Sequence, residues 1–385
     1  MMPQCYKTTT PWCRLRFFSV PRRCRVTRAC SASGAQASTQ RPLVIATRGS
    51  RLAQEQTRQV QQLLLAAAQL RDQSLELSTL AIDTAGDTSP SASLRSLGSG
   101  AFTEALDHAV LERRADMAVH SLKDCPATLA EGLVLAACLP RADPRDVLVA
   151  NEAKSLGELV PGSQVGTSST RRAAQIRHAF PYLQVIQLRG NVEARLERIK
   201  SGEISATVLS LAGLQRLGCE HVASKVLSVD EMVPAACQGA VGVVCREDDA
   251  WVIQLLSSIS HRSTFLEVSA ERACLSALLG SAEAGQAGQP FPDVAWGCNA
   301  KHDSDKATMD LDCFVSDLEG QELLSTRSTT GPWWIAKMPK PSAPCMATFS
   351  GWSREASDGC RSDELGSRAG GVWWLPDRAE NMLVP

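Results

Sequence analysis

The sequence predicts an α/β protein that has mostly parallel sheets and ends in a smaller α+β region. Apolar runs alternate with amphipathic helical stretches from residue 43 to residue 211, which is typical of βαβ units and parallel sheets. Beyond residue 249 this order changes to two helical stretches followed by two strand-like runs joined by a turn. The length of 385 residues leaves room for two or three domains.

The elements follow from the spacing of their apolar residues. Alternating or continuous short apolar runs predict strands, and apolar residues three or four positions apart predict helices. The first region has expected strands at 43–46, 75–82 and 115–119 and helices after residue 50 and at 102–113. The second has strands at 164–165, 183–188 and 206–211 and helices at 171–179 and 192–200. The third has helices at 250–259 and 263–279 and a hairpin of 307–315 and 322–325.

Composition excludes several classes of protein. Lys and Arg number 40 against 41 Asp and Glu, so a globally basic surface for nucleic acid is excluded. No apolar run approaches the roughly 18 residues of a membrane helix. The 14 cysteines show no CxxC pair and no repeated spacing, which favours reduced, buried thiols. We therefore expect no nucleic-acid partner, no membrane insertion and no bound metal.

The two ends differ from the middle of the chain. No Asp or Glu precedes Glu55, whereas Arg and Ser are frequent there, as in an organelle transit peptide. We predict a chloroplast transit peptide at 1–40, with the mitochondrion as the alternative. Residues 331–385 carry tryptophans without helical or strand periodicity, and no function is assigned to this tail.

Arginines stand beside hydroxyls or glycine in the loops that follow three predicted strands. Ligands of parallel sheets bind beyond the carboxyl ends of the strands, so these loops are expected to share one site. Guanidinium groups pair with carboxylate or phosphate, and free amides at a helix N-terminus add donors. The expected ligand therefore carries several anionic groups. The residues concerned are Arg48, Ser50, Thr167, Ser169, Arg171, Arg172, Arg189 and Arg195.

A further polar loop, HSLKD at 120–124, adds an amine and a carboxylate at the end of a strand. Nearby positive charge would keep Asp124 ionised, so it could stabilise a cation or relay protons. It could equally form an ion pair that only holds loops together. We interpret His120 as a structural histidine.

Six segments in order resemble the porphobilinogen deaminase (hydroxymethylbilane synthase) family over residues 42–280. They are IATR at 45–48, AVHSLKD at 118–124, DPRD at 143–146, VGTSS at 165–169, LRGNV at 188–192 and QGAVG at 238–242.

The resemblance implies two hinged, periplasmic-binding-protein-like domains and a small third domain. It also implies a monomeric transferase of heme and chlorophyll biosynthesis, which condenses four porphobilinogen molecules into hydroxymethylbilane with release of ammonia. The growing pyrrole oligomer would be built on a covalently bound dipyrromethane cofactor. The expected domains are 41–140 with 236–260, 141–235, and 261–330, between the leader at 1–40 and the tail at 331–385.

The resemblance also implies roles for individual residues. Asp124 matches the family's catalytic aspartate. The carboxylate-binding arginines would be Arg48, Arg171, Arg172, Arg189, Arg195 and Arg216, and the polar contacts Ser50, Ser121, Lys123, Thr167 and Ser169.

The family's cofactor cysteine has no counterpart at the expected position, which is Ala282. Cys274 and Cys298 are possible substitutes, although each is expected to be a buried structural thiol. Ser99 stands where the family has a lysine. Two alternatives to the enzyme therefore stay open: a non-catalytic or splice-altered homologue that binds carboxylate-rich pyrroles, and a generic hinged anion-binding protein.

Overall fold

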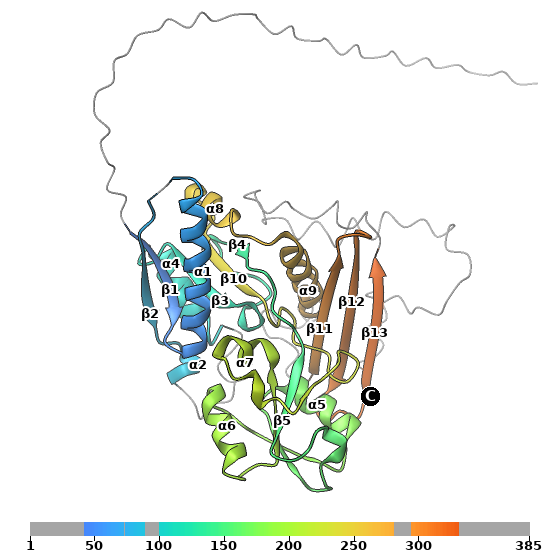
Figure 1. Ribbon diagram of the computed structural model, residues 1–385. Helices are drawn as coiled ribbons and strands as arrows, with labels where there is room; N and C mark the ends of the chain where they lie inside the picture. The colour runs from blue at the N-terminus through green and yellow to red at the C-terminus, as the bar shows by residue number, and fades with distance from the viewer. Residues whose placement is uncertain (1–41, 73, 89–99, 281–293, 331–385) are drawn as a thin grey trace, which may run out of the picture. The chain divides into compact units, whose positions relative to one another are not determined.

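The structure is a computed structural model that describes residues 42–72, 74–88, 100–280 and 294–330. In these residues the chain forms two five-stranded sheets and one three-stranded sheet, with helices packed against them (Figure 1). None of the helices in these ranges is both long enough and apolar enough to cross a membrane.

The first sheet has the order β2-β1-β3-β10-β4. Strand β1 is parallel to β2 and β3, whereas β10 is antiparallel to both of its neighbours. Four strands therefore run in one direction and one runs against them. The strands are β1 (Leu43–Arg48), β2 (Leu77–Ile82), β3 (Met117–Ser121), β4 (Leu133–Cys138) and β10 (Val241–Arg246). The helices of this region are α1 (Arg51–Gln69), α2 (Ala85–Thr88), α4 (Glu104–Leu111), α8 (Ala250–Ser257) and the short η1 (Leu122–Asp124).

The second sheet repeats this plan in the order β7-β6-β8-β5-β9, with β5 as its one reversed strand. Its strands are β5 (Asp146–Ala150), β6 (Gln164–Gly166), β7 (Gln184–Ile186), β8 (Ala206–Ser210) and β9 (Lys225–Val226). Its helices are η2 (Leu156–Glu158), α5 (Thr170–Ala179), α6 (Val192–Lys200), α7 (Leu211–Leu217) and η3 (Glu220–Val222).

The chain passes between the two sheets twice, from β4 to β5 and from β9 to β10. The two crossing segments touch where the Ala142 amide donates to the Gly239 carbonyl at 3.3 Å. Gly239 has φ +87°, and a Cβ there would lie 2.4 Å from the Ala142 oxygen. Only glycine accepts both this backbone conformation and this approach without strain.

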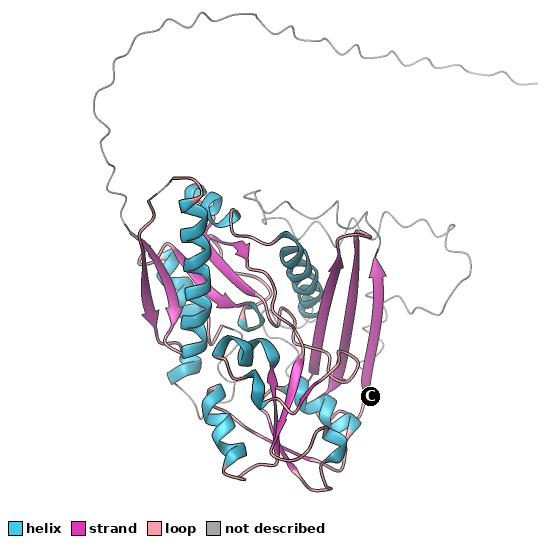
Figure 2. Cartoon of the chain, in the orientation of Figure 1, coloured by secondary structure: helices cyan, strands magenta, loops and turns pink. Residues whose placement is uncertain are grey.

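A third, antiparallel sheet lies beside a long helix (Figure 2). Helix α9 (Arg262–Gly280) packs against β11 (Val294–Asp303), which pairs with β12 (Thr308–Asp317), and β12 pairs with β13 (Leu323–Thr330). Leu266 and Ala270 on α9 pack with Ala300 and Met309 of the sheet, because residues four apart share one helix face.

The predicted fold class is confirmed. Each of the two α/β sheets is mostly parallel with one antiparallel strand, as in periplasmic-binding-protein-like folds, and a small α+β domain follows. The residue limits of the domains stay a prediction. Several elements differ from expectation. The predicted strand 183–188 shortens to β7, while β12 and β13 are longer than predicted. Strands β5, β9, β10 and β11 and helix α7 are among the elements that were not predicted. Strand β10 is buried at all six positions, so it lacks the alternation of a half-buried strand.

Candidate functional site

The loop between β6 and α5 is ordered by its own hydroxyl groups. Ser169 is the N-cap of α5, and its side chain accepts a hydrogen bond from the Arg172 amide at 3.4 Å. The buried Thr167 Oγ1 accepts one from the Ser169 amide at 3.1 Å. Such caps define where a helix starts, and the helix dipole there favours negative charge. The loop therefore fixes Arg171 and Arg172 in the first turn of α5.

Arg171 and Arg172 share one buried carboxylate. Arg171 Nη2 lies 2.7 Å from Asp146 Oδ2, and Arg172 Nη2 donates to Asp146 Oδ1 at 2.7 Å. Both also donate to backbone carbonyls, Arg171 to Val233 at 2.6 Å and Arg172 to Val208 at 2.8 Å. Burial opposes the ionisation of Asp146, but the two guanidinium groups outweigh it and hold its pKa at about 2. One positive charge is left over from the three groups.

The η1 segment brings Lys123 and Asp124 to the end of β3 in the other sheet. Burial lowers the pKa of Lys123 to about 8; Asp124 opposes this shift, and Arg172 and Arg171 add to it. Because Lys123 is nevertheless exposed to solvent, water moderates the lowering. These charge interactions show that the end of β3 and the start of α5 face a common region. Asp124 is half-buried, and its carboxylate makes no hydrogen bond or ion pair within the described part of the chain.

Arg189 and Arg195 flank the loop between β7 and α6 and have no carboxylate partner among the described residues. Arg189 Nη1 is buried there without a hydrogen-bond acceptor. Arg195 Nε donates to the Gly190 carbonyl at 2.9 Å. Burial, together with the charges of Arg172 and Arg189, lowers the pKa of Arg195 to about 10. These two guanidinium groups therefore remain available to an anion.

Taken together, five cations act on one another across the two sheets, and only Asp124 and Asp146 oppose them in the described chain. The four arginines are buried or half-buried, and such an excess of positive charge is stabilised when anions bind. We call this set the cationic cluster; its members are Lys123, Arg171, Arg172, Arg189 and Arg195.

Arg48 makes its described contacts elsewhere. Its guanidinium pairs with Asp87 through two hydrogen bonds of 3.0 and 2.5 Å. It also lies 4.3 Å above the centre of the Phe102 ring, a cation–π distance. In this structure the charge of Arg48 is therefore neutralised by Asp87 of α2.

Three other predicted residues serve local contacts. Ser50 is the N-cap of α1, and Ser121 Oγ accepts a hydrogen bond from Gln56 at 2.7 Å. Arg216 donates to the Gly239 carbonyl at 2.8 Å and so joins α7 to a crossing segment. Burial lowers the pKa of Arg216, against the opposing charge of Glu55.

Two residues of the site were not predicted individually, although both lie in segments that carried the resemblance. Asp146 is fully buried at the start of β5, and Gln238 Nε2 donates to its Oδ1 at 2.9 Å and to the Pro144 carbonyl at 2.7 Å. An acid directly before a buried apolar run could have signalled a buried ion pair, since carboxylates are rarely buried without a partner.

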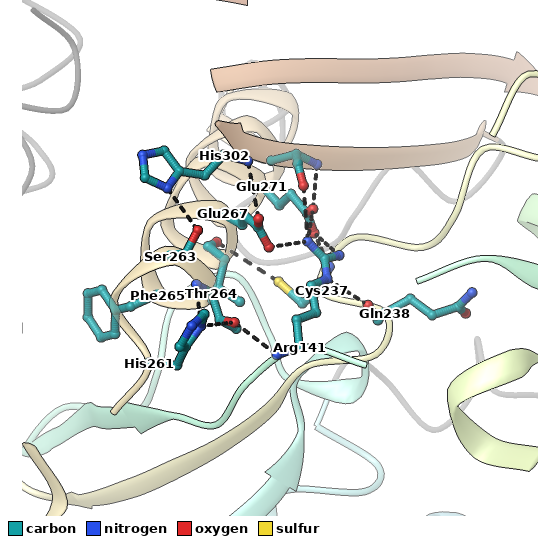
Figure 3. Close-up of polar contacts among 12 residues, drawn as sticks. Arg141, Cys237, Gln238, His261, Ser263, Thr264, Phe265, Glu267, Glu271 and His302 are labelled. Carbon is teal, nitrogen blue, oxygen red and sulfur yellow. Dashed lines mark hydrogen bonds and ion pairs between the residues drawn. The ribbon is translucent and has the colours of Figure 1, made fainter. Parts of the chain in front are cut away.

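The crossing segments are tied to α9 by a buried ion pair (Figure 3). Arg141 donates to Glu271 at 2.7 and 3.1 Å and, through Nε, to the Gln238 carbonyl at 3.0 Å. Glu271 also accepts hydrogen bonds from the amides of Cys237 and Ala300. Burial disfavours the charge on Arg141, but Glu271 outweighs it and raises the pKa of the guanidinium. The third domain thus holds both crossings at one point.

The predicted cofactor attachment position, Ala282, lies outside the described residues, as does Ser99. Cys298 is fully buried, as expected of a structural thiol, and Cys274 is half-buried. Both face Cys313 inside the third domain rather than the cationic cluster. The eight described cysteines are free thiols; five are buried, whereas Cys219, Cys274 and Cys313 are half-buried.

The cationic cluster fits a cofactor that carries carboxylates, because Arg189 and Arg195 lack acidic partners in the described chain. Asp124, similarly unpaired there, adds a negative charge beside it. The arrangement can therefore hold an anionic ligand while presenting one carboxylate to a positive centre.

Comparisons with known proteins identify the family. Residues 43–254 match the family model described as "Porphobilinogen deaminase, dipyromethane cofactor binding domain". The chain is 42% identical over 288 residues to "Porphobilinogen deaminase, chloroplastic" of Oryza sativa subsp. japonica, covering 72% of this chain and 80% of that protein. It is 42% identical over 250 residues to "Porphobilinogen deaminase" of Paracoccus denitrificans, covering 65% of this chain and 79% of that protein.

Among solved structures, the VFT2 domain of BvgS from Bordetella pertussis matches with a TM-score of 0.35 and 13% identity, over 61% of this chain and 91% of that one.

The matched family model spans more than half of the chain, and it includes the cationic cluster and Asp124. The chain therefore belongs to the porphobilinogen deaminase family.

Proposed function

We propose that this chain condenses four porphobilinogen molecules head to tail into hydroxymethylbilane and releases ammonia at each condensation. The observation that carries the proposal is the cationic cluster, which draws on both five-stranded sheets and leaves Asp124 without an ion-pair partner in the described chain. Each porphobilinogen bears an acetate and a propionate, and guanidinium groups pair with carboxylates in two-pronged hydrogen bonds.

In this proposal Arg189 and Arg195 bind substrate carboxylates, since their charges lack acidic partners among the described residues. Arg171 and Arg172 together carry two positive charges, of which Asp146 neutralises one. The remaining positive charge is held in place by the capped start of α5 and is available to the substrate. Such fixed donors need no rearrangement when the anion arrives.

Asp124 is proposed to stabilise the positive charge that develops as ammonia leaves the aminomethyl carbon. Its half-buried position strengthens charge interactions relative to those in bulk water. Lys123, the neighbouring cation, would orient a carboxylate so that the reacting carbon faces Asp124. The dipyrromethane cofactor, when bound, supplies the pyrrole on which the oligomer is built; the attachment residue in this chain is left open.

The test is ammonia release from porphobilinogen by the recombinant chain, with the protein mass measured in parallel. We expect Asp124→Asn to fold normally and to lower the rate by about 10²–10⁴-fold, the range for a group that acts on proton transfer or charge in the transition state. Asp248→Asn is the control, because Asp248 forms an exposed ion pair with Arg113 on the surface. Equal rates in the two variants would remove Asp124 from the mechanism.

The same assay separates the enzyme from a binding homologue. Wild-type chain that binds porphobilinogen, yet releases no ammonia and gains no covalent mass, would be a non-catalytic binder. Ammonia release with no covalent adduct on any cysteine would require a different attachment from that of the family.

We also propose that residues 1–40 direct the chain to the chloroplast. The support is the absence of acidic residues before Glu55 and the chloroplastic relatives from Oryza sativa and Pisum sativum. Import of a fluorescent protein fused to residues 1–60 into isolated chloroplasts tests this, and uptake by mitochondria alone would contradict it.

A further inference from the structure

Three thiols from three different elements meet inside the third domain. Cys274 lies on α9, Cys298 on β11 and Cys313 on β12. The Sγ atoms of Cys298 and Cys313 are 3.4 Å apart, and those of Cys274 and Cys313 are 3.6 Å apart. All three sulfurs lie within 4.8 Å of one another. We call these residues the thiol triad.

The fold itself brings the thiol triad together. Cys298 and Cys313 are direct partners in the antiparallel register of β11 and β12, so their side chains emerge on the same face of the sheet. Cys274 is four residues beyond Ala270, which packs against that sheet, and so continues the same helix face. Trp296 and Leu311 pack with the same core cluster as the triad and surround it with apolar groups.

Three converging sulfurs match the coordination of a soft metal ion. With metal–sulfur bonds of about 2.3 Å in a tetrahedral site, neighbouring thiolate sulfurs are about 3.8 Å apart. The observed separations need to open by only a few tenths of an ångström. Soft thiolate ligands select zinc-class and cuprous ions over magnesium or calcium. A disulfide, by contrast, requires sulfurs about 2.05 Å apart, well below either measured distance.

We propose that Cys274, Cys298 and Cys313 together bind one thiophilic metal ion of the zinc class as three thiolates. No other Cys, His, Asp or Glu of the described ranges joins the group, so the protein supplies three ligands. Cys298 is buried, whereas Cys274 and Cys313 are half-buried, which leaves a side on which water or another small ligand completes the coordination. Such an ion would clamp α9 to the β11–β12 hairpin.

The experiment uses the full chain, reduced and freed of metal, and titrates it with Cd²⁺, whose bonds to thiolates absorb in the ultraviolet. We expect one tightly bound Cd²⁺ ion per chain, which also displaces zinc from chain loaded with zinc beforehand. Cys298→Ser and Cys313→Ser should each abolish this tight equivalent. Cys125→Ser and Cys219→Ser, which alter thiols outside the triad, are the matched controls and should retain it.

Cys274→Ser provides a check that does not depend on a fully buried substitution, and circular dichroism verifies that each variant is folded. Loss of the tight equivalent in folded Cys274→Ser, with retention in both controls, supports the proposal. Equal titrations in the triad and control variants would overturn it. A disulfide between Cys298 and Cys313, mapped by mass spectrometry in chain isolated without oxidant, would also overturn it.

Discussion

Replacing Asp146 by Asn should strongly destabilise the protein, because one carboxylate compensates two buried guanidinium groups. Arg171 and Arg172 are only 5% and 6% exposed, so neither can recover its hydration when the charge is removed. Removing one partner of a buried ion pair costs about 3–5 kcal/mol. We therefore expect a loss of that size in the free energy of unfolding at pH 7, measured by urea titration.

The pH dependence of this loss can be worked out from the same pairing. The pKa of Asp146 falls from an ordinary value of 3.8 to about 2 in the folded state. At about 1.4 kcal/mol per pKa unit, this shift corresponds to about 2–3 kcal/mol. A lowered pKa stabilises the fold above pH 3.8, and the contribution is lost as the pH falls from 3.8 to about 2. The stability difference between wild type and Asp146→Asn should therefore narrow across that window.

Asp143→Asn is the matched control, two residues earlier in the same crossing segment. Its partner Arg145 has a side chain 43% exposed, and exposed ion pairs contribute about 0–1 kcal/mol. The reasoning would be refuted if Asp146→Asn and Asp143→Asn were equally stable at pH 7. It would also fail if the difference in unfolding free energy between wild type and Asp146→Asn stayed constant as the pH falls from 3.8 to about 2.

Three further predictions address other contacts. Glu271→Gln should lower the free energy of unfolding by about 3 kcal/mol, the lower end of the range for a broken buried pair, because the buried Arg141 loses its closer charged partner and keeps only Glu267 at 3.5 Å; an unchanged urea midpoint would contradict this. Gly239→Ala should lower the free energy of unfolding, again measured by urea titration, by about 1–3 kcal/mol through its positive φ, and further through the clash of the new Cβ with the Ala142 oxygen. Gly162→Ala is the control, because Gly162 has a similar φ of +83° but open space around it, so its cost reports the backbone strain without the clash. Porphobilinogen binding should weaken at alkaline pH, because the lowered pKa of Lys123 makes it lose its proton earlier than an ordinary lysine, and Lys123→Met should remove this dependence in a calorimetric titration.

Local patterns were sufficient for much of the fold. Helix α6 was predicted with its exact limits, since Asn191 caps it and its apolar residues follow helical spacing. Strand β10 was missed because it is buried on both faces, and its antiparallel position depends on a partner far along the chain. Pairing between distant segments is a property of the assembled sheet and leaves no local periodicity to read.

The site was only partly predictable for the same reason. The loops with Arg171, Arg172, Arg189 and Arg195 were located correctly as arginine-rich strand ends, and the structure brings them together with Lys123. Their roles as ligands of carboxylates stay predictions. The share of positive charge that Asp146 neutralises could not be predicted, since it depends on side-chain contacts between residues 26 positions apart. The thiol triad is likewise absent from the sequence pattern, because its members come from a helix and two strands.

The double crossing of the chain has a consequence for synthesis on the ribosome. In the first sheet β3 pairs with β10, for example Ser121 with Val241. Strand β10 comes last along the chain, so the first sheet cannot be completed until the whole second sheet has been synthesised. Closing so long a loop is slow unless the intervening segment folds first and draws its ends together. The middle of the chain should thus act as an autonomous early folding unit. Slow elongation before β10 is complete at residue 246 would leave the edge of β3 unpaired and open to aggregation.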